Sequence, residues 1–219
     1  MELELFSYWI GIAATVAFSI TAVLAVSGRG VDLFGAITLG FITAVDGGTI
    51  RDIILDVPVF WAVDLSYVWF GIGSSVAAFL ARPLFARRHI FSLLLYLDGF
   101  GAALFAVQGT DKTLDLQFGI PLAPIILGVV TGIGGGLLRD VLAGRQTLIM
   151  SRDIYAVPLL LGSVFYVILA KLLPGYMTLN GVISIAATFS MRAAVIYWKL
   201  QVPKWLMTAP DKQNNADQQ

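Results

Sequence analysis

Two short motifs contain the residues of this chain that could do chemistry. The first is Gly-Gly-Thr-Ile-Arg-Asp at residues 47–52, and the second is Gly-Gly-Gly-Leu-Leu-Arg-Asp at residues 134–140. Both lie inside apolar stretches, where each glycine weakens a helix by about 1 kcal/mol relative to alanine. An arginine and an aspartate at such a place are also costly unless they are partnered or hydrated. Because the chain contains this unfavourable motif twice, we expect it to serve a function.

The second motif is an internal repeat of the first. A shift of 88 positions aligns Arg51 with Arg139 and Asp52 with Asp140, and the match extends outward. The other aligned pairs are Gly40 with Gly128, Thr43 with Thr131, Gly47 with Gly135, Gly48 with Gly136 and Tyr67 with Tyr155. Three further charged residues, Asp46, Asp98 and Arg192, also lie within apolar stretches. We expect Asp98 to meet an arginine, hydroxyl groups, water or a cation, and Arg192 to extend to the membrane surface.

The elements that must position these residues are membrane-spanning helices. The chain is 58% hydrophobic and only 13% charged, with a mean hydropathy of +0.85, whereas about a quarter of the residues of a soluble domain are charged. Apolar runs of about 20 residues, each long enough to cross a bilayer, predict an all-α integral membrane protein with seven transmembrane helices. The predicted spans are residues 6–28, 35–55, 66–86, 90–109, 121–142, 154–173 and 180–198. A net charge of zero and the lack of cysteine argue against a nucleic-acid surface and a disulfide framework.

The loops predict the orientation and the domain plan. Lysine and arginine gather on the side that contains the C-terminus, so we predict a cytoplasmic C-terminus and an outer N-terminus in a prokaryotic plasma (inner) membrane. The acidic start, Met1-Glu2-Leu3-Glu4, is unlike a signal peptide, so the first run is expected to be a true span. Repeat 1 (about 6–86) and repeat 2 (about 90–173) have three spans each and must therefore be inverted relative to one another. Helix 180–198 follows, and the polar segment 203–219 is predicted to be a disordered cytoplasmic tail.

We predict that the second and fifth helices are broken at their glycines. Such breaks would free backbone carbonyls near the membrane midplane, where they could hold a monovalent cation. Neighbouring residues point about 100° apart on a helix, so each arginine is better placed to pair with a group on another helix than with the adjacent aspartate. We expect the two arginines to be neutralised by carboxylates among Asp46, Asp52, Asp98 and Asp140. The predicted ion pathway comprises Thr43, Asp46, Gly47, Gly48, Arg51, Asp52, Asp98, Thr131, Gly134, Gly135, Gly136, Arg139 and Asp140.

In a purely structural interpretation, the glycines allow two helices to cross closely, and the charged residues form interior ion pairs that hold the helices together. Seven interior charges are more than packing requires, which favours function: Asp46, Arg51, Asp52, Asp98, Arg139, Asp140 and Arg192. The sequence contains no catalytic Ser-His-Asp set, no metal-ligand spacing and no P-loop, so neither an enzyme nor a cofactor is expected. The alternatives are a transporter of a small zwitterion such as glycine, with the carboxylate at helix N-termini, and an assembly protein.

The paired motifs, together with Leu-Asp-Gly-Phe-Gly-Ala-Ala-Leu-Phe-Ala at residues 97–106, resemble the prokaryotic trimeric intracellular cation (TRIC) channels. The resemblance implies a homotrimer in membrane lipid, with one potassium- or sodium-permeable pore per subunit, lined partly by kinked second and fifth helices. The animal members of this family carry a basic Lys-Glu-Val motif that binds phosphoinositides. The third span here is not followed by a counterpart of that motif, so the resemblance does not extend to phosphoinositide regulation. Bacterial sequences of this kind are also classed as glycine transporter domains, so the transporter alternative stays open.

Overall fold

The structure is a computed structural model that describes residues 2–84 and 87–203, with side chains described for residues 5–84 and 90–203. Apart from one isolated bridge between Asp153 and Gln201, the described residues form helices and loops. The α-helices are α1 (Glu2–Ala25), α2 (Leu33–Ile54), α3 (Phe60–Val63), α4 (Ser66–Ala81), α5 (Arg87–Asp115), α6 (Leu122–Leu142), α7 (Ala156–Leu172) and α8 (Met177–Trp198). Three 3-10 turns lie at Arg82–Leu84, Leu148–Met150 and Pro174–Tyr176. The predicted disordered tail lies outside the described residues beyond position 203.

Seven long helices occupy the predicted spans, and α3 is an additional short turn of helix. Five of them, α1, α2, α5, α6 and α8, are long and apolar enough to cross a membrane, while α7 has 17 residues and α4 has 16. Length and composition therefore support an integral membrane protein with at least five spans.

Helix α5 is longer than the predicted 90–109. The hydroxyl groups of Thr110 and Thr113 donate to the backbone carbonyls of Ala106 and Gly109, at 2.8 and 2.7 Å. These polar side chains are therefore satisfied within the helix, which continues to Asp115. As a result, Asp111 and Lys112, which the sequence places in a loop, lie on a helix inside the bundle.

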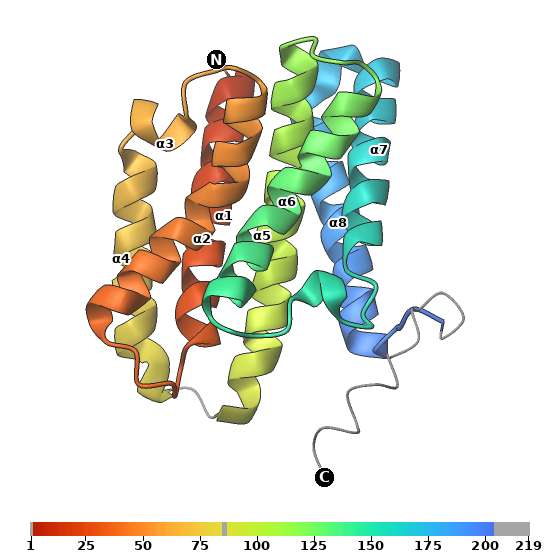
Figure 1. Ribbon diagram of the computed structural model, residues 1–219. Helices are drawn as coiled ribbons and strands as arrows, with labels where there is room; N and C mark the ends of the chain where they lie inside the picture. The colour runs from red at the N-terminus through yellow and green to blue at the C-terminus, as the bar shows by residue number, and fades with distance from the viewer. Residues whose placement is uncertain (1, 85–86, 204–219) are drawn as a thin grey trace, which may run out of the picture.

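The helices form two groups of three plus α8 (Figure 1). Helices α1, α2 and α4 pack on one another, as do α5, α6 and α7, while α1 contacts α5 and α2 contacts α6 across the middle. Helix α8 packs on α5 and α7. In Figure 1, α1 runs downward from the end that holds the N-terminus, whereas α5 runs upward. We call the end near the N-terminus the upper end and the end near the C-terminus the lower end.

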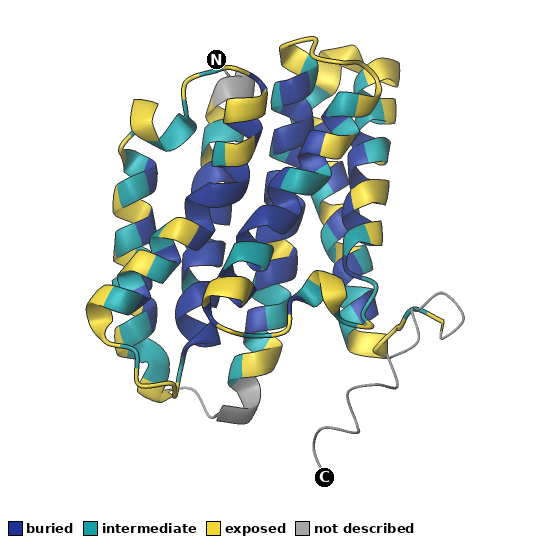
Figure 2. Cartoon of the chain, in the orientation of Figure 1, coloured by how far each residue is buried: buried dark blue, intermediate teal, exposed yellow. Residues whose placement is uncertain are grey.

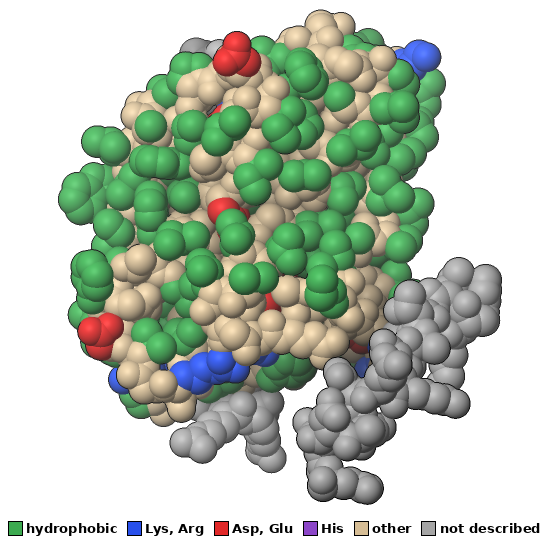
Figure 3. All heavy atoms as spheres, in the orientation of Figure 1, with side chains coloured by type: hydrophobic (Ala, Val, Ile, Leu, Met, Phe, Trp, Pro, Cys, Tyr) green, Lys and Arg blue, Asp and Glu red, His purple; other side chains and the backbone are tan. Residues whose placement is uncertain are grey.

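The buried residues line the middle of the bundle, and the outer surface is apolar. Figure 2 shows the buried segments along the facing sides of α1, α2, α5 and α6. Within this core the rings of Phe18 and Phe105 stack with centroids 5.6 Å apart. Large apolar side chains are exposed on the outside, including Phe34 at 77% and Ile53 at 66%. Figure 3 shows hydrophobic side chains over the flank and most of the visible lysine and arginine at the lower end, which is the surface expected of a membrane protein.

The predicted helix breaks at the glycines are not observed. Helix α2 is continuous through Gly47 and Gly48, and α6 is continuous through Gly134, Gly135 and Gly136. The physical reason is that each glycine makes room for a neighbour while its own backbone stays in the helix. The prediction that these helices expose free backbone carbonyls near the membrane midplane is therefore wrong.

Candidate ion pathway

The two glycine motifs meet where α2 crosses α6. A Cβ atom added at Gly47 would lie 2.3 Å from the carbonyl oxygen of Thr131, and one added at Gly135 would lie 2.7 Å from that of Thr43. The same shift of 88 positions relates these two contacts, so the crossing is reciprocal. A Cβ atom at Gly134 would lie 2.7 Å from the Cα atom of Gly47. The helix backbones are thus in direct contact at this crossing, and both threonines are fully buried there.

The first charged cluster lies above the crossing. The Nε atom of Arg51 donates to Oδ1 of Asp52 at 2.8 Å, and the Lys112 ammonium donates to the same oxygen at 2.7 Å. The backbone N–H of Phe60, the first residue of α3, donates to the other carboxylate oxygen at 2.9 Å. Asp52 therefore holds two cations and also fixes the start of α3.

The second charged cluster lies below the crossing. The guanidinium of Arg139 donates to Asp140 at 2.9 Å, to Asp98 at 2.7 Å and to the hydroxyl of Thr21 at 3.1 Å. The N–H of Leu148 donates to Oδ2 of Asp140 at 3.2 Å. Leu148 follows Asp140 by the same interval that separates Phe60 from Asp52, so each motif aspartate holds the loop that follows its helix.

The expectation that each arginine pairs with another helix rather than with the adjacent aspartate is wrong for Arg51, which bonds to Asp52, and only partly right for Arg139, which bonds to both Asp98 and Asp140. The Cα–Cβ bonds of the neighbouring arginine and aspartate do diverge on the helix, but the arginine side chain is long enough to fold back so that Nε reaches the adjacent carboxylate. The predicted partner of Asp98 is confirmed as Arg139. Asp46 was also expected to neutralise an arginine, but it forms no ion pair within the part of the chain that the structure describes, and its Oδ2 atom is buried without a hydrogen-bond partner.

Asp46 has no carboxylate counterpart in the second motif, where the shift of 88 positions aligns it with Gly134. The absent side chain of Gly134 leaves the space that the Asp46 carboxylate occupies, because a Cβ atom there would lie 3.6 Å from Oδ1 of Asp46. The backbone N–H of Gly47 donates to that oxygen at 2.5 Å. A single carboxylate thus sits at the crossing itself.

Helix α5 makes the two clusters different, a feature that sequence reasoning missed. It supplies Lys112 to the first cluster and Asp98 to the second, whereas residues 5–25 of α1 contain no charged residue. The formal charge of Arg51, Asp52 and Lys112 is therefore +1, and that of Arg139, Asp140 and Asp98 is −1. In the sequence, Lys112 lies within one helical turn of Asp111 and Asp115, and such a cluster of charges is more typical of a hydrated loop than of a helix inside a bundle.

Two cavities approach the crossing from opposite ends. The upper cavity, of about 670 Å³, is lined by both charged and aromatic residues: Ser7, Tyr8, Arg51, Phe60, Val63, Tyr67, Gln108, Asp111, Lys112 and Asp115. The lower cavity, of about 430 Å³, reaches Asp140 and is lined by Arg29 and Arg145 among others. Burial lowers the pKa of the Arg145 guanidinium, which lies in the loop after α6. Arg51 and Lys112 thus face one cavity and Asp140 the other, while Arg139 and Asp98 are enclosed between them.

The sequence matches a family model described as "Glycine transporter" at residues 8–83 and 95–171, which correspond to the two groups of three helices. The chain is 35% identical to the UPF0126 inner membrane protein YadS of Escherichia coli over 202 residues, covering 91% of this chain and 96% of that protein. It is 34% identical to a UPF0126 membrane protein of Vibrio cholerae over 204 residues, covering 92% and 83%.

Solved structures with the same fold are described as channels. The TRIC trimeric intracellular cation channel orthologue from Rhodobacter sphaeroides is 35% identical, with a TM-score of 0.83, over 89% of this chain and 98% of that one. A prokaryotic TRIC channel crystallised in 0.5 M KCl is 26% identical, with a TM-score of 0.84, over 91% and 100%. Sequence and structure agree over almost the whole chain, and the protein is therefore a member of the prokaryotic TRIC channel family.

Proposed function

We propose that the protein is a monovalent cation channel, permeable to potassium, with one pore in each subunit of a homotrimer. The proposed pore follows the interior of the subunit from the upper cavity, past the crossing of α2 and α6, to the lower cavity. The observation that supports it most directly is that two cavities approach one helix crossing, with buried charged groups above and below it. Charged side chains that lie within the membrane and face the interior of the bundle are typical of ion pathways.

In this proposal the crossing is the constriction. The backbones of α2 and α6 touch at Gly47, Gly134 and Gly135, so a cation could pass only if the two helices move apart there. The ion pairs Lys112–Asp52 above this contact and Arg139–Asp98 below it tie α2 and α6, respectively, to α5. The carboxylates of Asp46 at the crossing and of Asp140 at the lower cavity would favour cations over anions.

The orientation and location belong to the same proposal. We propose that the lower end faces the cytoplasm of a prokaryotic cell, because lysine and arginine gather at the cytoplasmic ends of membrane helices. The relative in Escherichia coli is described as an inner membrane protein, which supports this location.

Single-channel recording in a planar bilayer under a potassium chloride gradient tests the function. We expect discrete cation-selective currents from the native protein. Gly48→Leu should reduce or abolish them, because a side chain there would collide with the Phe60 ring, 2.5 Å from an added Cβ atom. Arg139→Ala should alter gating, because it removes the cation that holds Asp98 and Asp140 together. Gly73→Leu, at an exposed position with open space around it, serves as the control.

A second function, transport of a small zwitterion such as glycine, is favoured by the description of the family model. The upper cavity has both charges that a zwitterion would need, with Arg51 and Lys112 for a carboxylate and Asp111 and Asp115 for an ammonium group. If the protein is a carrier, the planar bilayers should show no single-channel current, while labelled glycine accumulates in proteoliposomes made from the same preparation. That result would identify the protein as a carrier rather than a channel.

A further inference from the structure

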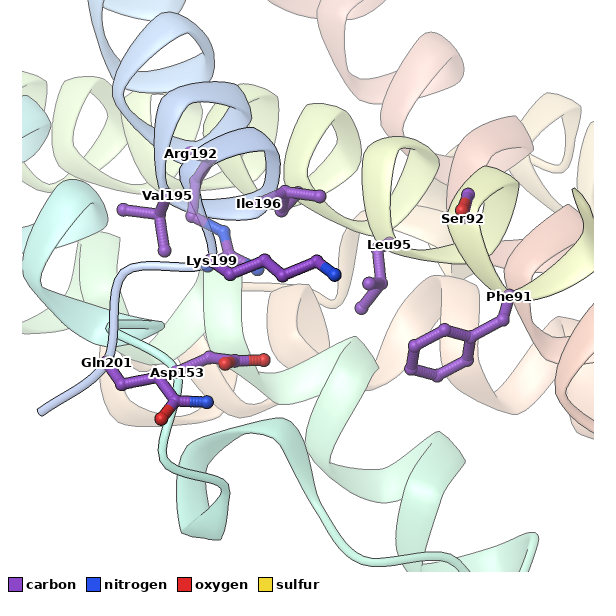
Figure 4. A pocket seen from close by; sticks show the side chains of 9 residues that line it. All are labelled: Phe91, Ser92, Leu95, Asp153, Arg192, Val195, Ile196, Lys199 and Gln201. Carbon is purple, nitrogen blue, oxygen red and sulfur yellow. The ribbon is translucent and has the colours of Figure 1, made fainter.

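A second pocket at the lower end of the bundle, of about 380 Å³, lies between α5, α8 and the segment before α7. It shares Phe91 and Asp153 with the lower cavity, but neither glycine motif lines it. Figure 4 shows the residues that do: Phe91, Ser92, Leu95, Asp153, Arg192, Val195, Ile196, Lys199 and Gln201. One side of the pocket is apolar and the other contains two cations and one carboxylate.

The pocket lies at the level of a membrane boundary. The apolar span of α8 ends at Trp198 and that of α5 begins at Ile90, and both ends line the pocket or adjoin it. Tyr197 and Trp198 are 75% and 66% exposed at the same level. Exposed aromatic residues at the end of a span are typical of the headgroup region of a bilayer. A ligand in this pocket would therefore be next to phospholipid headgroups.

Arg192 was expected to extend to the membrane surface, but it is buried, with only 1% of its surface exposed. Its Nη1 atom donates to the carbonyl of Ile154 at 3.2 Å, and its guanidinium lies 4.5 Å from the centre of the Tyr155 ring. Its Nε atom has no hydrogen-bond partner among the described residues, although the side chain lines the pocket. A buried donor without a partner is costly, so an acceptor from outside the protein would stabilise this arrangement.

Lys199 and Asp153 provide the other charges. Lys199 ends α8 in a left-handed conformation, with φ of 51°, and Figure 4 shows its ammonium group extending across the pocket toward Leu95. The carboxylate of Asp153 lies on the wall formed with Gln201, and neither charged group forms an ion pair within residues 5–84 and 90–203. The pocket thus offers cations to an anion and, a short distance away, a carboxylate to a cation.

We propose that this pocket binds the headgroup of an aminophospholipid such as phosphatidylethanolamine. The phosphate accepts hydrogen bonds from Lys199 and from the guanidinium of Arg192, the ammonium group pairs with Asp153, and the acyl chains lie along Phe91, Leu95 and Ile196. A phosphate alone would be repelled by Asp153, which is why a headgroup with both charges fits better than an acidic one. Basic pockets between membrane helices are a recognised type of headgroup site.

Native mass spectrometry of the full-length protein in mild detergent tests this inference. We expect the native protein to retain added phosphatidylethanolamine in preference to phosphatidylglycerol. Lys199→Gln should reduce retention of phosphatidylethanolamine about tenfold, since a charge-assisted hydrogen bond is lost. Asp153→Asn should abolish the preference for phosphatidylethanolamine while leaving phosphatidylglycerol binding equal or stronger.

Lys171→Gln is the matched control, because Lys171 is an exposed lysine at the opposite end of the bundle. Equal retention by Lys199→Gln and Lys171→Gln would overturn the site. A native protein that retains phosphatidylglycerol as well as phosphatidylethanolamine, or retains neither, would overturn the headgroup assignment. None of these readouts depends on channel activity, so the inference can fail or hold independently of the proposed function.

Discussion

The two copies of the motif share their arginine and aspartate but differ in their neighbours. Above the crossing, Arg51 and Asp52 meet the Lys112 ammonium, whose side chain is 31% exposed to the upper cavity. Below it, Arg139 and Asp140 meet the Asp98 carboxylate, whose side chain is fully buried. Both neighbours come from α5, about four helical turns apart. A duplicated motif can therefore acquire opposite local charge from one helix that crosses both copies.

The difference in burial predicts the largest mutational effect. Asp98→Asn leaves the enclosed guanidinium of Arg139 with one carboxylate, so we expect a loss of about 3 kcal/mol in the free energy of unfolding, since breaking a buried ion pair is strongly destabilising. Lys112→Gln, the corresponding change in the first cluster, should cost less than about 1 kcal/mol because the ammonium is partly exposed. Denaturant titration in mixed micelles, followed by circular dichroism, measures both. Equal losses would show that the two clusters do not differ in burial.

The two copies are most alike in the contacts that Gly47 and Gly135 make at the crossing. Gly47→Ala and Gly135→Ala should each cost about 1–3 kcal/mol, because the added methyl group would collide with a threonine carbonyl of the other helix. Gly73→Ala, where the surrounding space is open, should be neutral or stabilising by up to about 1 kcal/mol. The same titration applies. If Gly47→Ala were as stable as Gly73→Ala, α2 and α6 would not be in direct contact.

The segment after the first motif forms a side-chain hydrogen bond with that motif, and the residue types at the aligned positions of the second copy cannot form the same bond. The indole N–H of Trp61 donates to the Thr49 hydroxyl at 2.9 Å, while the aligned residues in the second copy are Ile149 and Leu137. Thr49→Val should therefore cost about 1 kcal/mol in unfolding free energy. Thr38→Val is the control, since the exposed Thr38 hydroxyl donates only to the Phe34 carbonyl of its own helix. A larger loss for Thr38→Val than for Thr49→Val would contradict this assignment.

The charge of the upper cavity predicts the smallest effect, and it presupposes the proposed channel. Lys112→Glu replaces a cation by an anion in the cavity, so potassium conductance should rise by about twofold at low salt, through a higher local cation concentration. The increase should disappear near 1 M salt, where the Debye length is about 3 Å. Lys171→Glu, at the same end of the bundle but outside the residues that line the cavity, should leave conductance unchanged. A salt-independent change would point to a structural effect instead.

Much of this molecule follows from local sequence. Hydrophobic runs predict where each long helix lies, because the bilayer requires about 20 apolar residues and internally satisfied backbone groups. The need of a buried carboxylate for a cation predicted that Asp98 has a partner, and the structure identifies it as Arg139. The duplicated motif likewise identified the residues around which the bundle is built.

Tertiary packing decided what the motif residues do. Glycine weakens a helix locally, but the close approach of α2 and α6 at Gly47 and Gly135 depends on the backbones of Thr131 and Thr43, which are far away in the sequence. The sequence could therefore not distinguish a break from a tight crossing. Similarly, the ammonium of Lys112 finds its partner in Asp52 of another helix, a contact that local sequence does not specify. Composition and periodicity determine which segments are helices in the membrane, whereas long-range contacts determine which charges meet and which are enclosed.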